Sequence, residues 1–317
     1  MESVVKVSNL KKYFKEVKAV DDNSFQIQKG ELFGFLGVNG AGKSTTINML
    51  CTLFPPTEGE VEICGYRLGK KNEEIRRSIG VVCQNNSMDN RLSVRENLSI
   101  RGKLYERDSV KLRRKMDDVC EIMSLNDIVG RRYAKLSGGQ KRRCEIAAAL
   151  LHTPEVLFLD EPTTGLDPAT RKFVWESVEK LRQEMHMTVF LTTHYMEEAA
   201  RATNIAVMDA GHLKEQGTPF DLKERYAKDK LRMVAKAGKE QELIRILEQR
   251  ELSYQIKEAY INLTMDSSMQ SLPILEQCRD VLDGFEMVQG TMDDVFLNVT
   301  GRSPEHSFED RERGSFL

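Results

Sequence analysis

Apolar and polar residues alternate in the first part of the chain. Alternating runs occupy residues 3–10, 17–28 and 59–64, and such runs are typical of antiparallel strands that bury one face. Further runs, which begin at residues 31, 156 and 188, are short and continuously apolar, as expected of strands covered on both faces. A segment with helical character follows each of them. The pattern therefore predicts an α/β fold, whose chemistry should lie at the carboxyl ends of the strands.

Two later regions depart from this pattern. Residues 85–150 are charged and favour helix, which predicts a helical subdomain within a first domain that spans residues 1–220. Beyond residue 220, alternating and helical runs follow one another closely, and they predict a small C-terminal α+β domain over residues 221–301. The expected strands are 231–237, 259–265 and one near 285, and the expected helices are 239–250 and 271–282. The polar residues 302–317 are expected to be a disordered tail.

Composition narrows the class of protein. The 317 residues carry 47 basic and 49 acidic side chains, a net charge of −2, so no overall charge draws the chain to nucleic acid or to an anionic bilayer. No run approaches the roughly 18 apolar residues that span a bilayer, and the amino terminus lacks the apolar core of a signal peptide. We therefore expect a cytoplasmic chain that is soluble on its own. The six cysteines form no CxxC pair and are expected to stay reduced: Cys51, Cys64, Cys83, Cys120, Cys144 and Cys278.

The glycine-rich stretch GVNGAGKST, residues 37–45, has the spacing of a phosphate-binding loop. It follows an apolar strand and begins a helix, which is where such a loop must lie to aim backbone N–H groups at phosphates. Lys43 should bridge the β- and γ-phosphates of ATP, and the Ser44 hydroxyl should bind Mg²⁺. The residues of this loop expected to bind ATP are Gly37, Val38, Asn39, Gly40, Ala41, Gly42, Lys43, Ser44 and Thr45.

Three side chains at the ends of later strands are candidates for the chemistry. Asp160 and Glu161 end the apolar run VLFLDE; we expect Asp160 to hold Mg²⁺ and Glu161 to polarise the attacking water. Adjacent residues on a strand point to opposite faces, so the two carboxylates should not share one task. His194 ends the next apolar run and should donate a hydrogen bond at the same edge of the sheet. The alternative, that Asp-Glu-Pro merely ends a strand, is weakened by the phosphate loop in the same chain.

A second glycine-rich stretch, LSGGQ at residues 136–140, stands between the phosphate loop and the acid pair. Several short motifs follow one another along the chain: GVNGAGKST, the glutamine of IGVVCQNN, LSGGQ, LFLDEP, TGLD and TTH. With these motifs in this order, the chain resembles the ATP-binding subunits of ABC transporters over roughly residues 4–220. The resemblance implies a P-loop ATPase core with an antiparallel β subdomain and a helical signature subdomain. It also implies hydrolysis of ATP with Mg²⁺. In this family two subunits pack head to tail, and each ATP lies between the phosphate loop of one and the signature of the other.

The local chemistry of the signature agrees with that arrangement. A helix rich in alanine follows it, so free N–H groups and the positive end of a helix dipole would face an anion. By the resemblance, this anion is the γ-phosphate of the ATP that the partner subunit holds. The signature residues are Ser137, Gly138, Gly139 and Gln140.

The resemblance also implies roles for single residues. Tyr13 would stack on adenine, although Phe14 follows it where the family often has glycine; the alternative is a core aromatic residue. Gln84 would contact both ATP and Mg²⁺ and report on the membrane partner, so the metal ligands would be Ser44, Gln84 and Asp160. Asp167 would couple the two sites across the dimer. The catalytic residues would be Lys43, Glu161 and His194.

Within the family, THYMEEA at residues 193–199 and MDDVFLNVTGR at residues 292–302 resemble the daunorubicin-resistance type of drug and antibiotic exporter. This implies a homodimer of the ATPase subunit, a separate membrane permease as partner, and a peripheral position on the inner face of the cell membrane. The cargo is left open, because the permease selects it. The small C-terminal domain would be regulatory, or alternatively dimer-stabilising or solubilising.

An alternative function is that of a soluble ABC-type ATPase acting on ribosomes or DNA. Such proteins usually carry two ATPase halves, or inserted coiled coils or zinc sites, whereas this chain has one half, no heptads and no cysteine pairs. The basic clusters KRRC and GRRY are interpreted as solvated helix faces or subunit contacts, so no nucleic-acid partner is expected. A small-molecule kinase with the same loop is disfavoured by LSGGQ.

Overall fold

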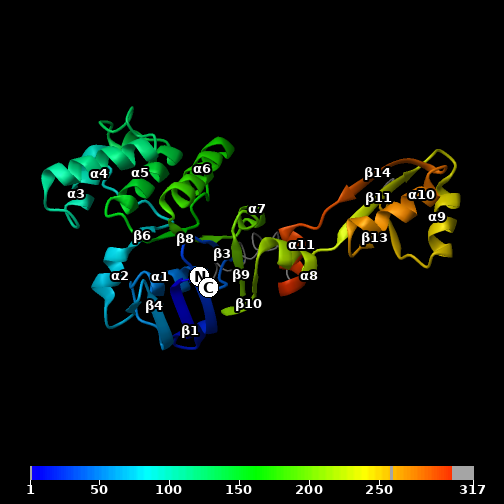
Figure 1. The fold of residues 1–317 in the computed structure, drawn as a ribbon, viewed down its shortest axis with the longest axis horizontal. Coiled ribbons are helices and arrows are strands. Elements are labelled where there is room, and N and C mark those ends of the chain that lie inside the picture. Colours follow the sequence, from blue (N-terminus) through cyan, green and yellow to red (C-terminus); the bar gives the residue numbers. More distant parts are fainter. Residues whose placement is uncertain (1, 258–259, 302–317) are drawn as a thin grey trace, which may run out of the picture. The chain divides into compact units, whose positions relative to one another are not determined.

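The computed structural model describes residues 2–257 and 260–301. The predicted disordered tail, residues 302–317, lies outside the described residues. The chain divides into two compact units, Met1–Gln216 and Gly217–Leu317. Two sheets belong to the first unit and one to the second (Figure 1).

The alternating runs near the amino terminus form an antiparallel sheet, as the pattern predicts. Strand β1 (Ser3–Phe14) lies between β2 (Val17–Gln28) and β4 (Glu58–Ile63), and β5 (Tyr66–Arg67) pairs with β4. Val7 faces Phe25 across one pairing and Val61 across the other, and all three side chains are buried. The alternation thus separates a buried face from a solvated one.

The second sheet has six strands in the order β10-β9-β3-β8-β7-β6. The continuously apolar runs are its strands β3 (Leu32–Leu36), β7 (Val156–Asp160) and β8 (Thr188–Thr193). From β9 to β6 the neighbours pair in parallel, and β3 and β8 are buried throughout. The pattern does not predict β6 (Ile79–Val82), β9 (Asn204–Asp209) or β10 (His212–Gly217). Their runs are short, and pairing with the central strands makes β6 and β9 part of the sheet.

The helices of the first unit connect these strands. Helices α3, α4 and α5 gather in one group (Figure 1), and each begins at a residue whose side chain accepts a hydrogen bond from the first turn: Ser93, Asp108 and Ser137. Such caps satisfy N–H groups that a helix start leaves free. The helical segments are α1 (Lys43–Leu50), α2 (Asn72–Ser78), α3 (Val94–Gly102), α4 (Ser109–Ile122), η1 (Tyr133–Lys135), α5 (Gly138–Leu150), α6 (Pro168–Met185) and α7 (Met196–Ala199).

Phenylalanine side chains fill the space between the two sheets of the first unit. The Phe190 ring of β8 lies 5.4 Å, centroid to centroid, from the rings of Phe35 and Phe158, and 6.5 Å from that of Phe25 on the antiparallel sheet. All four belong to one buried cluster. This contact holds the antiparallel sheet against the parallel sheet that carries the phosphate loop.

The second unit has the element order βαββαβ in one sheet with the strand order β12-β13-β11-β14. This is the ferredoxin-like arrangement, with its own core of Leu231, Leu243, Leu263 and Ile274 among others. Two flanking helices, α8 and α11, pack on each other. The elements are α8 (Pro219–Tyr226), β11 (Asp229–Ala235), α9 (Glu240–Gln249), β12 (Tyr254–Lys257), β13 (Tyr260–Met265), η2 (Ser268–Gln270), α10 (Ser271–Cys278), β14 (Leu282–Val288) and α11 (Met292–Thr300).

Removing the central ring of the phenylalanine cluster should destabilise the first unit strongly. Phe190→Ala deletes a fully buried ring and should lower the free energy of unfolding by about 3–5 kcal/mol. Urea titration followed by the fluorescence of Trp175, the single tryptophan of the chain, measures this change. Phe14→Ala is the control, since its ring is 46 % exposed, and should cost about 1 kcal/mol or less. Equal losses in the two variants would contradict the assigned role of the cluster.

Candidate active site

The phosphate loop lies between the end of β3 and the start of α1, and its glycines are required by the backbone. Gly40 and Gly42 have φ of 83° and 104°, a region that favours glycine. A Cβ at Gly37 would lie 2.5 Å from the Met208 carbonyl oxygen, and one at Gly42 2.3 Å from that of Ala19. Gly42 caps α1 without a side chain, so the N–H groups at the helix start remain available to an anion.

Lys43 is held inside this loop. Its side chain is 4 % exposed, and Nζ donates to the carbonyl oxygens of Gly37 at 2.7 Å and Val38 at 3.1 Å. Burial lowers the pKa of Lys43, while the nearby Glu161 opposes that shift. The carbonyl oxygens of the loop therefore fix the position of the Lys43 ammonium group. The next side chain, Ser44, is exposed at the first turn of α1.

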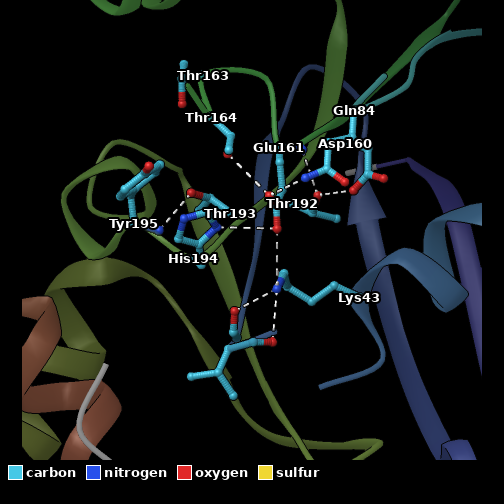
Figure 2. Close-up of polar contacts among 12 residues, drawn as sticks. Lys43, Gln84, Asp160, Glu161, Thr163, Thr164, Thr192, Thr193, His194 and Tyr195 are labelled. Carbon is cyan, nitrogen blue, oxygen red and sulfur yellow. Dashed lines mark hydrogen bonds and ion pairs between the residues drawn. The ribbon is translucent and has the colours of Figure 1, made fainter. Parts of the chain in front are cut away.

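The carboxylate of Glu161 lies at the centre of the site (Figure 2). Gln84 Nε2 donates to Glu161 Oε2 at 3.0 Å, and the Thr164 hydroxyl donates to the same oxygen at 3.2 Å. His194 Nδ1 lies 3.3 Å from Oε1, and Lys43 Nζ lies 3.8 Å from it. The His194 contact, followed by the charge of Lys43, holds the pKa of Glu161 below its ordinary value. The carboxylate is therefore ionised at neutral pH, as a base must be.

Asp160, the last residue of β7, has a different environment. The Thr192 hydroxyl donates to Asp160 Oδ1 at 2.6 Å and accepts from the Glu161 N–H at 3.0 Å. Burial raises the pKa of Asp160, because the charged form loses contact with water. Glu161 follows the end of the strand and has φ of 43°, so the two carboxylates diverge. Sequence reasoning gave Thr192 no role of its own, although it is the first residue of the TTH stretch, two positions before His194 at a strand end.

Two of the signature residues form hydrogen bonds within their own helix, α5. Ser137 Oγ accepts from the Gln140 N–H at 3.3 Å, and Gln140 Oε1 accepts from the Ser137 N–H at 3.1 Å. Gly139 packs against α6, since a Cβ there would lie 2.2 Å from Thr170 Cγ2. Asp167 caps that helix by accepting from the Thr170 N–H at 3.0 Å. Ser137, Gly138 and Asp167 are exposed, so the start of α5 and the start of α6 form one accessible face.

The structure brings together some predicted residues and leaves others apart. Gln84, Glu161, His194 and Lys43 meet in one network (Figure 2). Among residues 2–257 and 260–301, no hydrogen bond or ion pair joins the signature to the phosphate loop. In the same part of the chain, no group of three or more His, Cys, Asp or Glu residues could hold a metal by itself.

Tyr13 lies on β1, away from the side chains of that network. Its hydroxyl donates to Asp21 Oδ1 at 2.6 Å, which raises the pKa of Tyr13. The ring is half-buried, with Lys18 Nζ 5.5 Å from its centroid. It is therefore not enclosed in the core, which was the alternative interpretation.

One interpretation of a basic cluster is wrong. Arg142 of the KRRC stretch was expected on a solvated helix face or a subunit contact, yet it is 5 % exposed. Its guanidinium donates to the carbonyl oxygens of Cys83, Asp160 and Pro162. These carbonyls come from distant segments, so the sequence pattern could not place Arg142 among them.

Comparisons with known proteins agree with this geometry. The sequence profile of the ABC transporter family matches residues 20–164. The chain is 33 % identical over 306 residues to the daunorubicin resistance ATP-binding protein DrrA3 of Streptomyces coeruleorubidus, covering 95 % of this chain and 96 % of that protein. It is 36 % identical over 322 residues to the daunorubicin/doxorubicin resistance ATP-binding protein DrrA of Streptomyces peucetius, covering 97 % of each.

A solved structure is similar over the first part of the chain. The post-hydrolysis dimer of the ATP-binding cassette MJ0796 bound to ADP and Pi superposes with a TM-score of 0.63 and 28 % identity, over 68 % of this chain and 98 % of that one. In the described residues of this chain, no helix has the length and hydropathy to cross a bilayer. The relatives, the phosphate loop and the ionised carboxylate beside it lead to one conclusion. The chain belongs to the ABC transporter family as an ATP-hydrolysing subunit of the daunorubicin-resistance type.

Proposed function

We propose that the chain hydrolyses ATP as one half of a homodimer and drives a separate membrane permease. The observation that carries the proposal is the network in which Glu161 contacts Lys43, His194 and Gln84. It joins the phosphate loop to an ionised base and to the loop that begins after β6. ATP hydrolysis at the phosphate loop would therefore change the position of the loop after β6, which carries Gln84.

Each residue of the network has a task in this proposal. The loop of residues 37–45 cradles the phosphates, Lys43 bridges the β- and γ-phosphates, and Glu161 takes the proton of the attacking water. His194 orients that carboxylate through its Nδ1. The lowered pKa of Glu161 supports its role, because a base must be ionised. Tyr13 stacks on adenine.

The residues expected to hold Mg²⁺ fit the ion. Ser44, Gln84 and Asp160 offer oxygen atoms, the ligands that Mg²⁺ prefers. Burial raises the pKa of Asp160, so a cation beside it would stabilise its charged form. Mg²⁺, when bound, neutralises charge on the β- and γ-phosphates.

The exposed face formed by Ser137, Gly138 and Asp167 supports a shared site. In the homodimer this face binds the γ-phosphate held by the partner's phosphate loop, and Asp167 couples the two sites. Converting a mostly open population into a mostly closed one takes about 5.5 kcal/mol of differential binding. Several charge-assisted contacts at about 1.5–3 kcal/mol each can supply it. The dimeric structure of the cassette MJ0796 bound to ADP and Pi supports the formation of a dimer.

A cavity of about 310 Å³ beside the Gln84 loop supports contact with a permease. Cys83, Ser87, Arg101 and Tyr105 are among its lining residues, together with Leu53, which is 65 % exposed. Exposed apolar side chains around a hollow mark interaction sites. A permease segment bound there would touch the loop that carries Gln84. The chain would then lie peripherally on the inner face of the membrane.

The cargo we propose is a drug, an antibiotic or a related small molecule. Relatives of this chain are named for resistance to daunorubicin and, at 38 % identity over 236 residues, to linearmycin. These names support export as the direction of transport. The permease would select the individual compound.

Glu161→Gln should stop turnover without preventing ATP-dependent association. The amide cannot take a proton, so phosphate release should fall at least about 10²-fold, while size-exclusion chromatography with ATP and Mg²⁺ should show persistent dimers. Glu121→Gln, an exposed change on α4, is the control and should behave as the wild type. Wild-type turnover in Glu161→Gln would remove this residue from the proposed role.

Ser137→Arg should block closure of the dimer by placing a bulky cation on the signature face. Single subunits should bind ATP with a dissociation constant within about twofold of the wild type, because the phosphate loop is untouched. Dimers should be lost in the chromatographic assay, and ATP turnover should fall about tenfold or more. Ser109→Arg, also at an exposed helix start, should change neither property. Intact ATP-dependent dimers in Ser137→Arg would contradict the shared site.

Leu53→Glu should weaken attachment to the permease while leaving ATP binding intact. The change puts a charge into the wall of the cavity beside the Gln84 loop, and the exposed position should tolerate it. Recovery of the membrane subunit with the tagged ATPase from detergent extracts should drop severalfold. Leu272→Glu, at a side chain 56 % exposed in the second unit, is the matched control. Equal recovery with both variants would argue against docking at this cavity.

A further inference from the structure

Two charged residues of α5 are buried, although neither ends a strand, and in the described part of the chain neither forms a hydrogen bond or ion pair with the Glu161 carboxylate. Arg142 and Glu145 are each 5 % exposed and lie three residues apart, on one face of the helix. Long charged side chains are rarely buried unless they have partners. Their partners therefore indicate what they do.

Glu145 holds the backbone after Gln84. Its Oε1 accepts from the N–H groups of Ser87 at 2.8 Å and Met88 at 3.2 Å, and its Oε2 accepts from the Ser87 hydroxyl at 2.7 Å. The buried hydroxyl of Tyr133 also donates to Oε1, at 3.0 Å. An ionised carboxylate accepts at both oxygens, and no neutral side chain can satisfy these four donors in the same way.

Arg142 holds the backbone before Gln84. Its Nη1 donates to the Cys83 carbonyl oxygen at 2.6 Å, and its Nη2 donates to that of Asp160 at 3.0 Å. The same guanidinium thus links the residue before Gln84 to the residue before Glu161. Together the two side chains of α5 attach the Gln84 loop at both ends.

Gln84 itself lies between these attachments. Residues 83–87 are exposed, yet the Gln84 amide reaches the buried Glu161 carboxylate at 3.0 Å. A loop exposed to solvent can hold a side chain in one position only if both ends of the loop are fixed. The side chains that hold it project from the helix that begins at the signature.

We infer that Glu145, with Arg142, is a positioning residue that makes the location of Gln84 depend on α5. A shift of α5, when its exposed start binds an anion, would carry the Gln84 loop with it and alter the contact with Glu161. The inference rests on the proposed role of Gln84 at the ATP site. It adds a connection within one chain between the signature and the glutamine loop.

The Ser87 hydroxyl extends this connection to the cavity beside the loop. It donates to Glu145 Oε2, and it accepts from Arg101 Nη2 at 2.6 Å. Arg101 lines the cavity proposed for the permease. A bound segment that attracts Arg101 would therefore act on the same loop through Ser87.

The test is a double-mutant cycle on the full-length chain with Gln84→Ala and Glu145→Ala. Each single variant should lower kcat about tenfold, while the dissociation constant for ATP stays within about twofold of the wild type. If Glu145 acts through Gln84, the double variant should have kcat within about twofold of Gln84→Ala alone, because coupled residues are not additive. A double variant about a hundredfold slower than the wild type would overturn the inference.

Further variants separate the possible failures. Wild-type turnover in Gln84→Ala would refute the proposed role of Gln84 and this inference with it, whereas multiplying losses refute the inference alone. Tyr133→Phe removes one donor to Glu145 without touching the loop, and its kcat should stay within about twofold of the wild type. A tenfold loss there would assign the effect to packing and overturn the positioning role. Should Glu145→Ala not fold, Glu145→Gln takes its place in the same cycle, with the same outcomes.

Discussion

The burial of opposite charges at one edge of a parallel sheet is the constraint on which the rest of the structure depends. An isolated charge in a protein interior is costly, and Lys43 and Glu161 each have partners that only this fold provides. Loop carbonyls accept from Lys43, while His194 and Gln84 contact Glu161. Strand order makes this possible, since β8 lies between β3 and β7. The phosphate loop, the acid pair and His194 therefore meet where these strands end.

Helix α5 combines an exposed start with a buried face that contacts the Gln84 loop. Its start carries the exposed signature residues, and its buried face holds the Gln84 loop through Arg142 and Glu145. The exposed and buried parts belong to one hydrogen-bonded helix, so a force on its start is transmitted along its length. In the proposed dimer, this gives the chain a physical route from the signature residues to Glu161 through the Gln84 loop.

The second unit has its own sheet and its own apolar core. Its ferredoxin-like order arises from two alternating βαβ halves, and Leu231 and Leu263 pair directly across its central strands. None of the residues assigned to ATP binding or hydrolysis belongs to it. The chemistry of the first unit can thus be described without it, and a regulatory or dimer-stabilising role is compatible with its structure.

The sequence by itself determined the features that depend on neighbouring residues. The glycine spacing of residues 37–45 predicted the phosphate loop, because positive φ and close backbone approach are local requirements. Continuous apolar runs predicted β3, β7 and β8, and alternation predicted β1, β2 and β4, because side-chain direction follows strand periodicity. The family resemblance of LSGGQ and the other motifs added the activity.

Only the tertiary structure decided which polar groups meet. Gln84 and Glu161 are 77 positions apart, and Thr192 bonds Asp160 from another strand. Arg142 was expected on a solvated helix face or at a subunit contact and is buried, since the carbonyls that accept its hydrogen bonds come from three separate positions. The periodicity of a sequence indicates which face of a helix or strand is apolar. It does not indicate which distant segment supplies a partner for a charged side chain. That pairing sets the pKa of Glu161 and the position of the Gln84 loop.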